Sequence, residues 1–403
     1  MKIAHVSIIV FFFCVFSSLV IGQSMNNVAT TVGTREHLLM DFGWRFALGH
    51  ATDVKKDFNH ATGYFSYFAK AGYGDGPAAK DFDDRMWRNL NLPHDWAVEL
   101  PFDSLASYSH GYKAIGRNYP ASTIGWYRKT FSIPKSDLGR RMSIQFDGVF
   151  RNARVWVNGF YLGEEHCGYY GFQYDFTDYL NYGDKNVVSV RVDATMEEGW
   201  FYEGAGIYRH VWLNKTAPLH VAPSGIFVFS EVKGNIADVT VHASISNEAA
   251  GIANYEIIHT IITADKTTLL KKEITQLSLN PGAVQEFSSV LQLVQPHLWS
   301  IEEPYLYTLV TIVRSGKTTV DSVETTFGIR TLRFDAEEGF FLNGKHVYLK
   351  GTNNHQDHAG VGIAIPEALH EFRIKRLKEM GSNAYRCSHN PPTPELLDVC
   401  DRL

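Results

Sequence analysis

The stretch Arg154-Val-Trp-Val-Asn-Gly-Phe-Tyr-Leu-Gly163 decides how the first part of the chain folds. Two short runs rich in β-branched and aromatic residues, the types favoured in strands, flank Asn158-Gly159. That dipeptide tolerates positive φ at both turn positions and is a strong hairpin signal. The stretch therefore predicts two antiparallel strands joined by a tight turn.

The same alternation continues on both sides of the hairpin. In Arg140–Gly148, the residues Met142, Ile144 and Phe146 share one face, and we expect this segment to be the partner of 154–163. Further on, alternate residues are again apolar at Val188, Val190 and Val192. Residues 35–218 are therefore predicted to form one antiparallel sandwich or jelly roll.

An aromatic, glycine-rich stretch from Tyr64 to Pro77 follows neither the helix nor the strand period. It predicts a long loop. We favour a loop that caps the sandwich, and a wall facing the substrate is the alternative.

A second run of alternating segments covers residues 219–333. Roughly seven short strands in this length are typical of an immunoglobulin-like sandwich. No side chain in it suggests chemistry, so we interpret it as a spacer domain. The expected strands include Ile226–Phe229, Ala237–Ile245, Tyr255–Ile262, Phe287–Leu293, Leu306–Val313 and Val320–Thr326.

The pattern changes after Phe334, where residues 334–403 begin a third domain. Phe340–Lys350 predicts a hairpin that leads into a buried strand. A helix is expected from Pro366 to Gly381, then a short strand at Asn383–Cys387 and a second helix starting near Thr393. This order is the opening of a parallel α/β barrel or a doubly wound sheet. The expected apolar face of the first helix comprises Leu369, Phe372, Leu377 and Met380.

Polar side chains gather where the two predicted parallel strands end. The carboxyl ends of barrel strands form the active face, so these residues are expected to converge on one mouth. Their donors and acceptors suit a hydroxyl-rich ligand. Two alternatives are a metal site formed by His355, Asp357 and His358, and simple capping of the strand ends by polar groups. The residues are His355, Asp357, His358, Arg386, His389 and Asn390.

Composition narrows the classes of protein further. The 403-residue chain has 45% apolar residues, a net charge of -5 and no basic block, so no nucleic-acid partner is expected. Residues 1–22 start with Lys2 and continue as an apolar run, which predicts a secretory signal peptide cleaved after Gly22. An uncleaved membrane anchor is the alternative. We expect a periplasmic or secreted protein without membrane contact once the signal is removed.

The cysteine count bears on whether the exported protein is held together by disulfide bonds. Removing the signal peptide leaves Cys167, Cys387 and Cys400. An odd number of cysteines in an exported protein argues against a disulfide framework.

Three stretches together resemble glycoside hydrolase family 2, which comprises β-galactosidases, β-glucuronidases and β-mannosidases. Two shorter motifs, Leu92-Pro-His-Asp-Trp96 and Gly125-Trp-Tyr-Arg128, are similar to the first domain of that family. The resemblance spans nearly the whole mature chain in the family's order. The three stretches are Glu198-Gly-Trp-Phe-Tyr-Glu-Gly-Ala-Gly-Ile-Tyr-Arg-His-Val-Trp-Leu213, His297-Leu-Trp-Ser-Ile-Glu-Glu-Pro-Tyr-Leu-Tyr307 and Asn383-Ala-Tyr-Arg-Cys-Ser-His-Asn-Pro391.

The resemblance implies a mainly β chain: a jelly-roll sugar-binding domain, an immunoglobulin-like sandwich and the first strand-helix units of a TIM (β/α)8 barrel. It implies that His355 and His389 contact the sugar and that Arg386 orients the nucleophilic carboxylate. The loop from Trp200 to Gly204 matches a segment that reaches over the active site, with Glu203 as a stand-in for an acidic residue found there. Asn390 departs from the Tyr that is common at its position.

The resemblance also implies retaining hydrolysis by two Glu residues on later barrel strands, the acid directly preceded by Asn. Retention needs two carboxyl groups about 5–5.5 Å apart. After residue 334 the chain has no Asn-Glu pair, so both catalytic residues are expected beyond Leu403. The glutamates on the predicted helices, expected to point away from the mouth, are Glu367, Glu371, Glu379 and Glu395.

The sequence thus favours an exported β-glycosidase, most similar to β-galactosidases, acting on an oligosaccharide or polysaccharide without a cofactor. A β-glucuronidase or another β-glycosidase of the family is one alternative. A non-catalytic carbohydrate-binding protein is another, and a structural protein that uses only the sandwiches is a third. Asp357 is also among the predicted substrate-binding residues. The oligomeric state stays open, and a homo-oligomer is one option.

Overall fold

The computed structural model describes residues 35–62 and 73–403. The predicted signal peptide at 1–22 lies outside these residues, as does most of the predicted aromatic loop at 64–77. Among the described residues, no helix is both long and apolar enough to cross a membrane.

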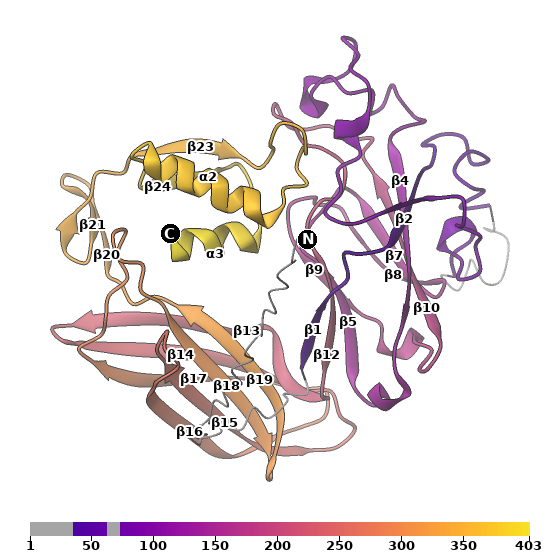
Figure 1. Cartoon of the computed structure of the whole chain (residues 1–403). Coiled ribbons are helices and arrows are strands. Elements are labelled where there is room, and N and C mark those ends of the chain that lie inside the picture. The colour runs from indigo at the N-terminus through magenta and orange to yellow at the C-terminus, as the bar shows by residue number, and fades with distance from the viewer. Residues whose placement is uncertain (1–34, 63–72) are drawn as a thin grey trace, which may run out of the picture. The chain divides into compact units, whose positions relative to one another are not determined.

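The first domain is an antiparallel β sandwich of two main sheets (Figure 1). The six-stranded sheet has the order β3 (Arg88–Leu90), β2 (Trp44–Leu48), β4 (Ile124–Ser132), β10 (Lys185–Asp193), β7 (Ala153–Val157), β8 (Phe160–Glu165). The four-stranded sheet has the order β1 (Glu36–Leu39), β12 (Val211–Thr216), β5 (Arg141–Phe146), β9 (Phe172–Asp175). A short pair joins β6 (Val149–Phe150) to β11 (Gly206–Ile207).

One apolar core lies between the two sheets of this sandwich. Ile144 of β5 and Leu213 of β12 belong to the same buried cluster as Val155 of β7 and Val190 of β10. Inward-facing residues of two stacked sheets form such a core. Short 3-10 helices connect the strands at Gly76–Ala78, Ala97–Glu99, Tyr108–His110, Lys135–Asp137 and Thr177–Tyr179.

The predicted hairpin is confirmed, but its predicted partner is wrong. β7 and β8 pair across Asn158-Gly159, whose φ angles are 52° and 89°. Segment 140–148 lies in the other sheet, where β5 pairs with β12 and β9. Its apolar residues are buried as expected. The alternation identified the strands correctly and carried no information on which sheet each strand joins.

Gly159 gives a first testable prediction. Its φ of 89° disfavours any side chain, and a Cβ there would also overlap the ring of Tyr73. We expect Gly159→Ala to lower the unfolding free energy by about 2–3 kcal/mol, from backbone strain and overpacking together. Gly139 is the matched control, because its φ is 94° and no atom lies within 4 Å of a Cβ there. Urea unfolding should show a smaller loss for Gly139→Ala, and equal losses would contradict the steric contribution.

The second domain is a sandwich of seven strands, as predicted. One sheet has the order β13 (Leu219–Lys233), β14 (Ile236–Asn247), β17 (Val284–Val294). The other has the order β16 (Thr268–Leu279), β15 (Ala253–Ile262), β18 (Tyr307–Ser315), β19 (Thr318–Phe327). Of these seven strands, only β16 was not predicted. It is an edge strand with mostly exposed side chains, so its sequence lacks a clear apolar alternation.

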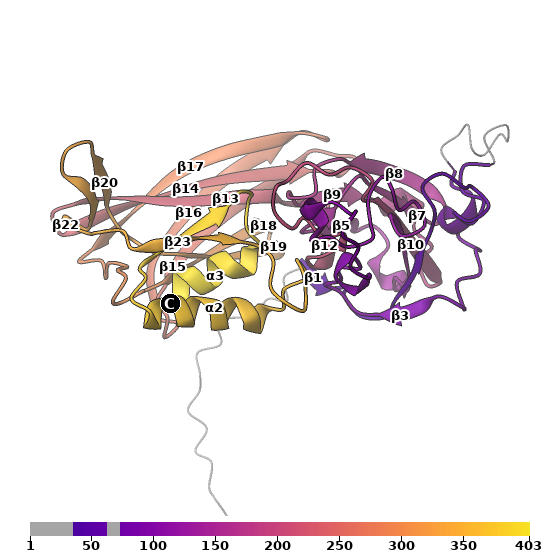
Figure 2. The same cartoon turned by 90° about the horizontal axis from the view of Figure 1, so that it is seen from above.

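The third part of the chain starts with a small hairpin sheet and continues with two parallel strands and two helices. The hairpin sheet comprises β20 (Leu332–Asp335), β21 (Gly339–Leu342) and β22 (Lys345–His346). β23 (Gly351–His355) and β24 (Ala384–Ser388) are parallel, and α2 (Glu367–Glu379) and α3 (Pro394–Arg402) accompany them (Figures 1 and 2). The predicted order of strand, helix, strand and helix is confirmed.

Two details of this part were predicted wrongly. Residues 347–350 form no buried strand, since Tyr348 is 75% exposed and the strand starts at Gly351. Helix α2 buries His370 and Ile374, whereas Phe372 and Met380 are exposed. The packing partners explain the second difference, because Ile374 contacts Leu396 and Val399 of α3 in one cluster. Of the predicted apolar face, Leu377 does pack against this cluster, so the prediction is correct in part.

Candidate active site

The parallel pairing of β23 and β24 brings two histidines together. The register runs from Gly351 opposite Ala384 to His355 opposite Ser388, so His389 follows immediately after the paired end of β24. The two imidazole centroids lie 5.2 Å apart, with their planes at 88°. The structure therefore joins the two strand ends at the point that the sequence indicated.

Two aromatic side chains of the first domain complete a group that we call the four-ring cluster: Trp200, Phe201, His355 and His389. The Trp200 ring centroid lies 5.7 Å from that of His389 and 6.4 Å from that of His355. Phe201 lies 4.8 Å from His355. Trp200 remains 69% exposed, so much of this residue is accessible to a ligand. The cluster combines an aromatic surface with ring nitrogens, the combination that sugar rings and their hydroxyls require.

Arg386 lies on the β24 face that it shares with Ser388, because side chains alternate along a strand. Its Nη1 donates hydrogen bonds to Asn353 Oδ1 at 3.0 Å and Ser388 Oγ at 3.2 Å. Within residues 35–62 and 73–403, no carboxylate forms an ion pair with Arg386. Its guanidinium therefore has donors left for an acidic partner.

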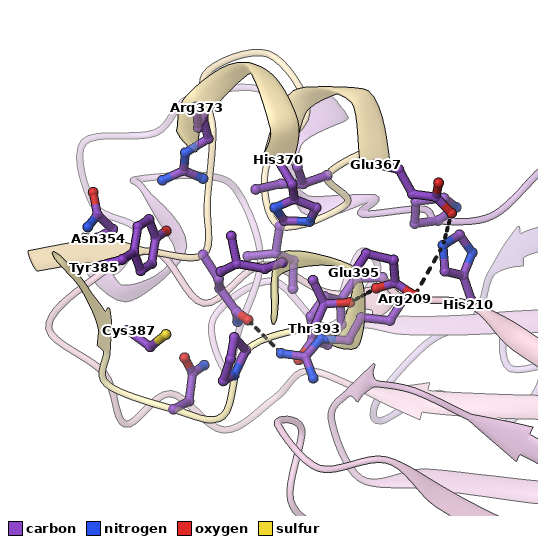
Figure 3. Close-up of a pocket in the computed structure, with 18 of the residues that line it drawn as sticks. Arg209, His210, Asn354, Glu367, His370, Arg373, Tyr385, Cys387, Thr393 and Glu395 are labelled. Carbon is purple, nitrogen blue, oxygen red and sulfur yellow. Dashed lines mark hydrogen bonds and ion pairs between the residues drawn. The ribbon is translucent and has the colours of Figure 1, made fainter. Parts of the chain in front are cut away.

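The structure shows the local surroundings of the remaining predicted residues, and their convergence with the four-ring cluster stays a prediction. Asn390 lines a small cavity of about 40 Å³. Among the described residues, its buried Nδ2 has no hydrogen-bond partner. Tyr385 and Cys387, which alternate with Arg386 on β24, line the same cavity (Figure 3). Asn390 thus borders the cavity that Thr393 and Glu395 at the start of α3 also line.

Asp357 and His358 belong to a turn that follows β23. The backbone N–H of His358 donates to the carbonyl of Gly362 at 2.9 Å, and that of Gly362 donates back at 3.0 Å. The carbonyl of Asp357 accepts from Arg373 of α2 at 3.3 Å. In the described residues, no group of three or more His, Cys, Asp or Glu side chains is arranged as metal ligands.

Glu203 is buried inside the loop that carries Trp200. Its carboxylate accepts the N–H of Glu198 at 3.1 Å and the hydroxyl of Tyr169 at 3.4 Å. Burial raises its pKa. These contacts fix the 198–203 loop, and the contact of Glu203 with a sugar stays a prediction.

The helix glutamates fall into two groups. Glu371 and Glu379 form ion pairs within α2, with Lys375 and Arg376, on the exposed surface. The other two, Glu367 and Glu395, converge on His210 of the first domain. None of the four lies in the four-ring cluster.

His210 is surrounded by three carboxylates. Its Nδ1 contacts Asp41 at 2.6 Å, and its Nε2 lies 3.5 Å from Glu367 and 3.7 Å from Glu395 (Figure 3). The hydrogen bond to Asp41 raises the pKa of His210 to about 9. A charged His210 therefore links the first domain to the first turns of α2 and α3.

This arrangement predicts a pH-dependent contribution to stability. The folded-state pKa of His210 lies above the ordinary value of about 6.5, so the stabilisation is complete below pH ~6.5 and is lost as pH rises through about 9. We expect His210→Gln to lower the unfolding free energy by about 2 kcal/mol at pH 7 and by much less at pH 10. Urea unfolding between pH 6 and 10 measures the difference.

The control for this prediction is His297→Gln. His297 pairs with Glu303 at 3.0 Å on the surface, where an ion pair contributes roughly 0–1 kcal/mol. A loss for His210→Gln that does not change with pH would contradict the ionic link.

Sequence reasoning missed three residues that build the site. Phe201 stands inside the stretch Glu198–Leu213, and its contacts with the two histidine rings depend on the three-dimensional fold. Arg209 donates to Gln356 Oε1 at 3.2 Å and to the Pro391 carbonyl at 2.8 Å, which ties the first domain to both strand-end loops. Asp95 lies in the Leu92–Trp96 motif, and its isolated buried carboxylate carried no spacing signal.

Comparison with known proteins identifies the family. The model of the sugar binding domain of glycosyl hydrolases family 2 matches residues 81–217. The family's central model matches residues 220–330, and the model of its TIM barrel domain matches residues 335–403. The chain is therefore built from domains of a glycoside hydrolase.

Individual relatives agree with these models. The chain is 41% identical over 336 residues to beta-galactosidase BoGH2A of Bacteroides ovatus, a match that covers 82% of this chain and 38% of that protein. It is 34% identical over 330 residues to a beta-glucuronidase of Bacteroides fragilis, covering 78% of this chain and 45% of that protein. A solved glycosyl hydrolase family 2 member from Bacteroides cellulosilyticus matches with a TM-score of 0.79 and 32% identity, covering 91% of this chain and 44% of that one.

The chain belongs to glycoside hydrolase family 2. Its architecture is mainly β: a sugar-binding sandwich, an immunoglobulin-like sandwich and strand-helix units of a TIM barrel. It spans less than half the length of the two curated relatives described above.

Proposed function

We propose that this chain is part of an exported, retaining β-glycosidase similar to β-galactosidases, and that the four-ring cluster forms its first sugar subsite. The observation that carries this proposal is the meeting of His355, His389 and Trp200 at the carboxyl ends of two parallel strands. Active sites of parallel barrels lie at this end of the strands. A β-galactosidase and a β-glucuronidase among the relatives support a β-linked sugar as substrate.

In this proposal the residues of the chain bind and orient, and two glutamates outside it perform the bond cleavage. One carboxylic acid protonates the leaving oxygen while a carboxylate about 5–5.5 Å away attacks the anomeric carbon. The resulting glycosyl-enzyme is hydrolysed by water, so the anomeric configuration is retained.

Each residue of the site then has a defined task. The ring nitrogens of His355 and His389 hydrogen-bond to sugar hydroxyls, and the exposed face of Trp200 packs against the ring. The free donors of Arg386 hold the nucleophilic carboxylate in its ionised form and in the correct orientation. We also propose that Asp357, Asn390 and Glu203 contribute to binding of the substrate.

The experiment that tests this function is hydrolysis of a panel of aryl glycosides by the complete gene product. We expect release of the aryl group from β-galactosides, with the product sugar initially formed as the β anomer in proton NMR spectra. A preference for β-glucuronides would select the alternative sugar. Binding of an oligosaccharide without any hydrolysis would favour a carbohydrate-binding protein and contradict the enzyme proposal.

Export is a separate part of the proposal, supported only by the start of the sequence. Lys2 and the apolar run that ends before Gly22-Gln23 are typical of a cleaved signal. Amino-terminal sequencing of the protein recovered from the periplasm or the medium should begin near Gln23. Recovery of the uncleaved chain from the membrane would contradict export in soluble form.

A further inference from the structure

Asp95 is a buried carboxylate that accepts four hydrogen bonds. Its Oδ1 accepts the N–H of Ala97 at 3.0 Å and of Ala205 at 2.9 Å. Its Oδ2 accepts the hydroxyl of Tyr202 at 2.8 Å and the N–H of Ile363 at 3.0 Å. Four donors match the lone pairs of one ionised carboxylate, so no other side chain of this size fits the same set.

Ala97 lies two residues from Asp95, and the other three donors come from two distant segments of the chain. Tyr202 and Ala205 belong to the first-domain loop that carries Trp200 and Phe201. Ile363 follows the turn after β23, the strand that ends with His355. The Asp95 carboxylate thus connects the loop that carries Trp200 and Phe201 to the segment that follows His355.

Two glycines allow this close approach. Gly204 has a φ of 67°, and a Cβ there would lie 2.7 Å from Asp95 Oδ2. Gly362 has a φ of 62°, and a Cβ there would overlap the same oxygen. Each of the two segments therefore presents a glycine with positive φ to one carboxylate oxygen, and a side chain at either position would push the segments apart.

We propose that Asp95 is a positioning residue of the active site, which sets the distance between Trp200 and the two histidines without touching the substrate. This inference rests on the proposed function, because it assigns the four-ring cluster to the bound sugar. A displacement of about 1 Å at a reacting site can reduce the rate about 10²-fold. Losing the Asp95 contacts should therefore impair catalysis more than it impairs folding.

Asp95→Asn in the complete gene product is the direct test. The amide keeps the size of the carboxylate but offers one acceptor oxygen, and it turns an NH2 group toward a remaining donor. We expect kcat/KM for an aryl β-glycoside to fall about 10–100-fold, mainly through kcat. Hydrogen exchange at the amides of Ala205 and Ile363 should accelerate at least ~10-fold, while exchange in β10 stays unchanged.

Asp83→Asn is the matched control, because Asp83 is exposed and pairs only locally with Arg85 at 2.6 Å. It should leave kcat, KM and exchange unchanged. Tyr202→Phe removes a single donor and keeps the ring, so it carries the test if Asp95→Asn does not fold. We expect it to lower kcat/KM about 3–10-fold and to accelerate exchange at the same two amides.

The outcomes separate this inference from the proposed function. A folded Asp95→Asn protein with unchanged kcat/KM, or with β10 loosened as much as Ala205 and Ile363, would overturn the positioning role. If the wild-type protein hydrolyses no glycoside, the proposed function fails. Exchange at Ala205 and Ile363 would then still test the contact itself, and unchanged exchange in Asp95→Asn would refute it.

Discussion

In the complete gene product, Arg386→Ala is expected to lower kcat/KM for an aryl β-glycoside by about 10²–10³-fold. Arg386 shares a face of β24 with Ser388, the residue directly before His389. In the described residues, its guanidinium donates two hydrogen bonds, both to neutral partners, Asn353 and Ser388. A carboxylate placed beside it would gain charge-assisted hydrogen bonds. Without Arg386 the nucleophile loses both orientation and charge stabilisation, which should lower kcat more than it raises KM.

Two further variants make this prediction specific. Arg386→Lys keeps the charge without the planar fork, so it should recover only part of the activity. Arg376→Ala serves as control, since Arg376 is exposed on α2 and pairs with Glu379 of the same helix. Steady-state kinetics of the three proteins provide the comparison. Wild-type kcat and KM in Arg386→Ala would remove Arg386 from the site.

The second large effect concerns the chain of 403 residues by itself, which we expect to hydrolyse no aryl β-galactoside above the uncatalysed rate. Retaining hydrolysis requires two carboxyl groups close together. Among residues 35–62 and 73–403, the four helix glutamates are held in ion pairs or at His210, away from the four-ring cluster. Binding groups without an acid and a nucleophile cannot open the glycosidic bond.

A colorimetric assay of the purified chain tests this prediction against the complete gene product at equal concentration. Trace contamination by a host enzyme is excluded with His389→Ala, which should leave any contaminating activity intact. Turnover that persists through purification and disappears in His389→Ala would contradict the prediction and would place a catalytic pair within these 403 residues.

Much of the fold could be predicted because strand alternation and turn chemistry are local. Asn158-Gly159 specified its hairpin, and Val188, Val190 and Val192 specified one buried face of β10. The sheet to which each strand belongs depends on contacts distant in sequence, which explains the wrong partner for segment 140–148. Strand β16 was missed because a solvent-exposed edge does not impose the apolar alternation on its sequence.

The candidate site was predictable to the extent that strand order determines it. His355 and His389 end two parallel strands, so their approach follows from topology. Topology does not determine where a residue lies once its strand has ended. Asn390, for example, lines the cavity near His210. Asp95 and Phe201 depend on packing between separate segments, for which a single sequence gives no periodic signal.

The most direct test of the sugar subsite is a crystal structure of the complete gene product with a galactose-derived group trapped covalently on its nucleophile. We predict that sugar oxygens lie within about 3.2 Å of ring nitrogens of His355 and His389. We also predict that the indole of Trp200 packs against the bound sugar. A sugar bound elsewhere, with none of these three side chains in contact with it, would contradict the assignment of the four-ring cluster as the first subsite.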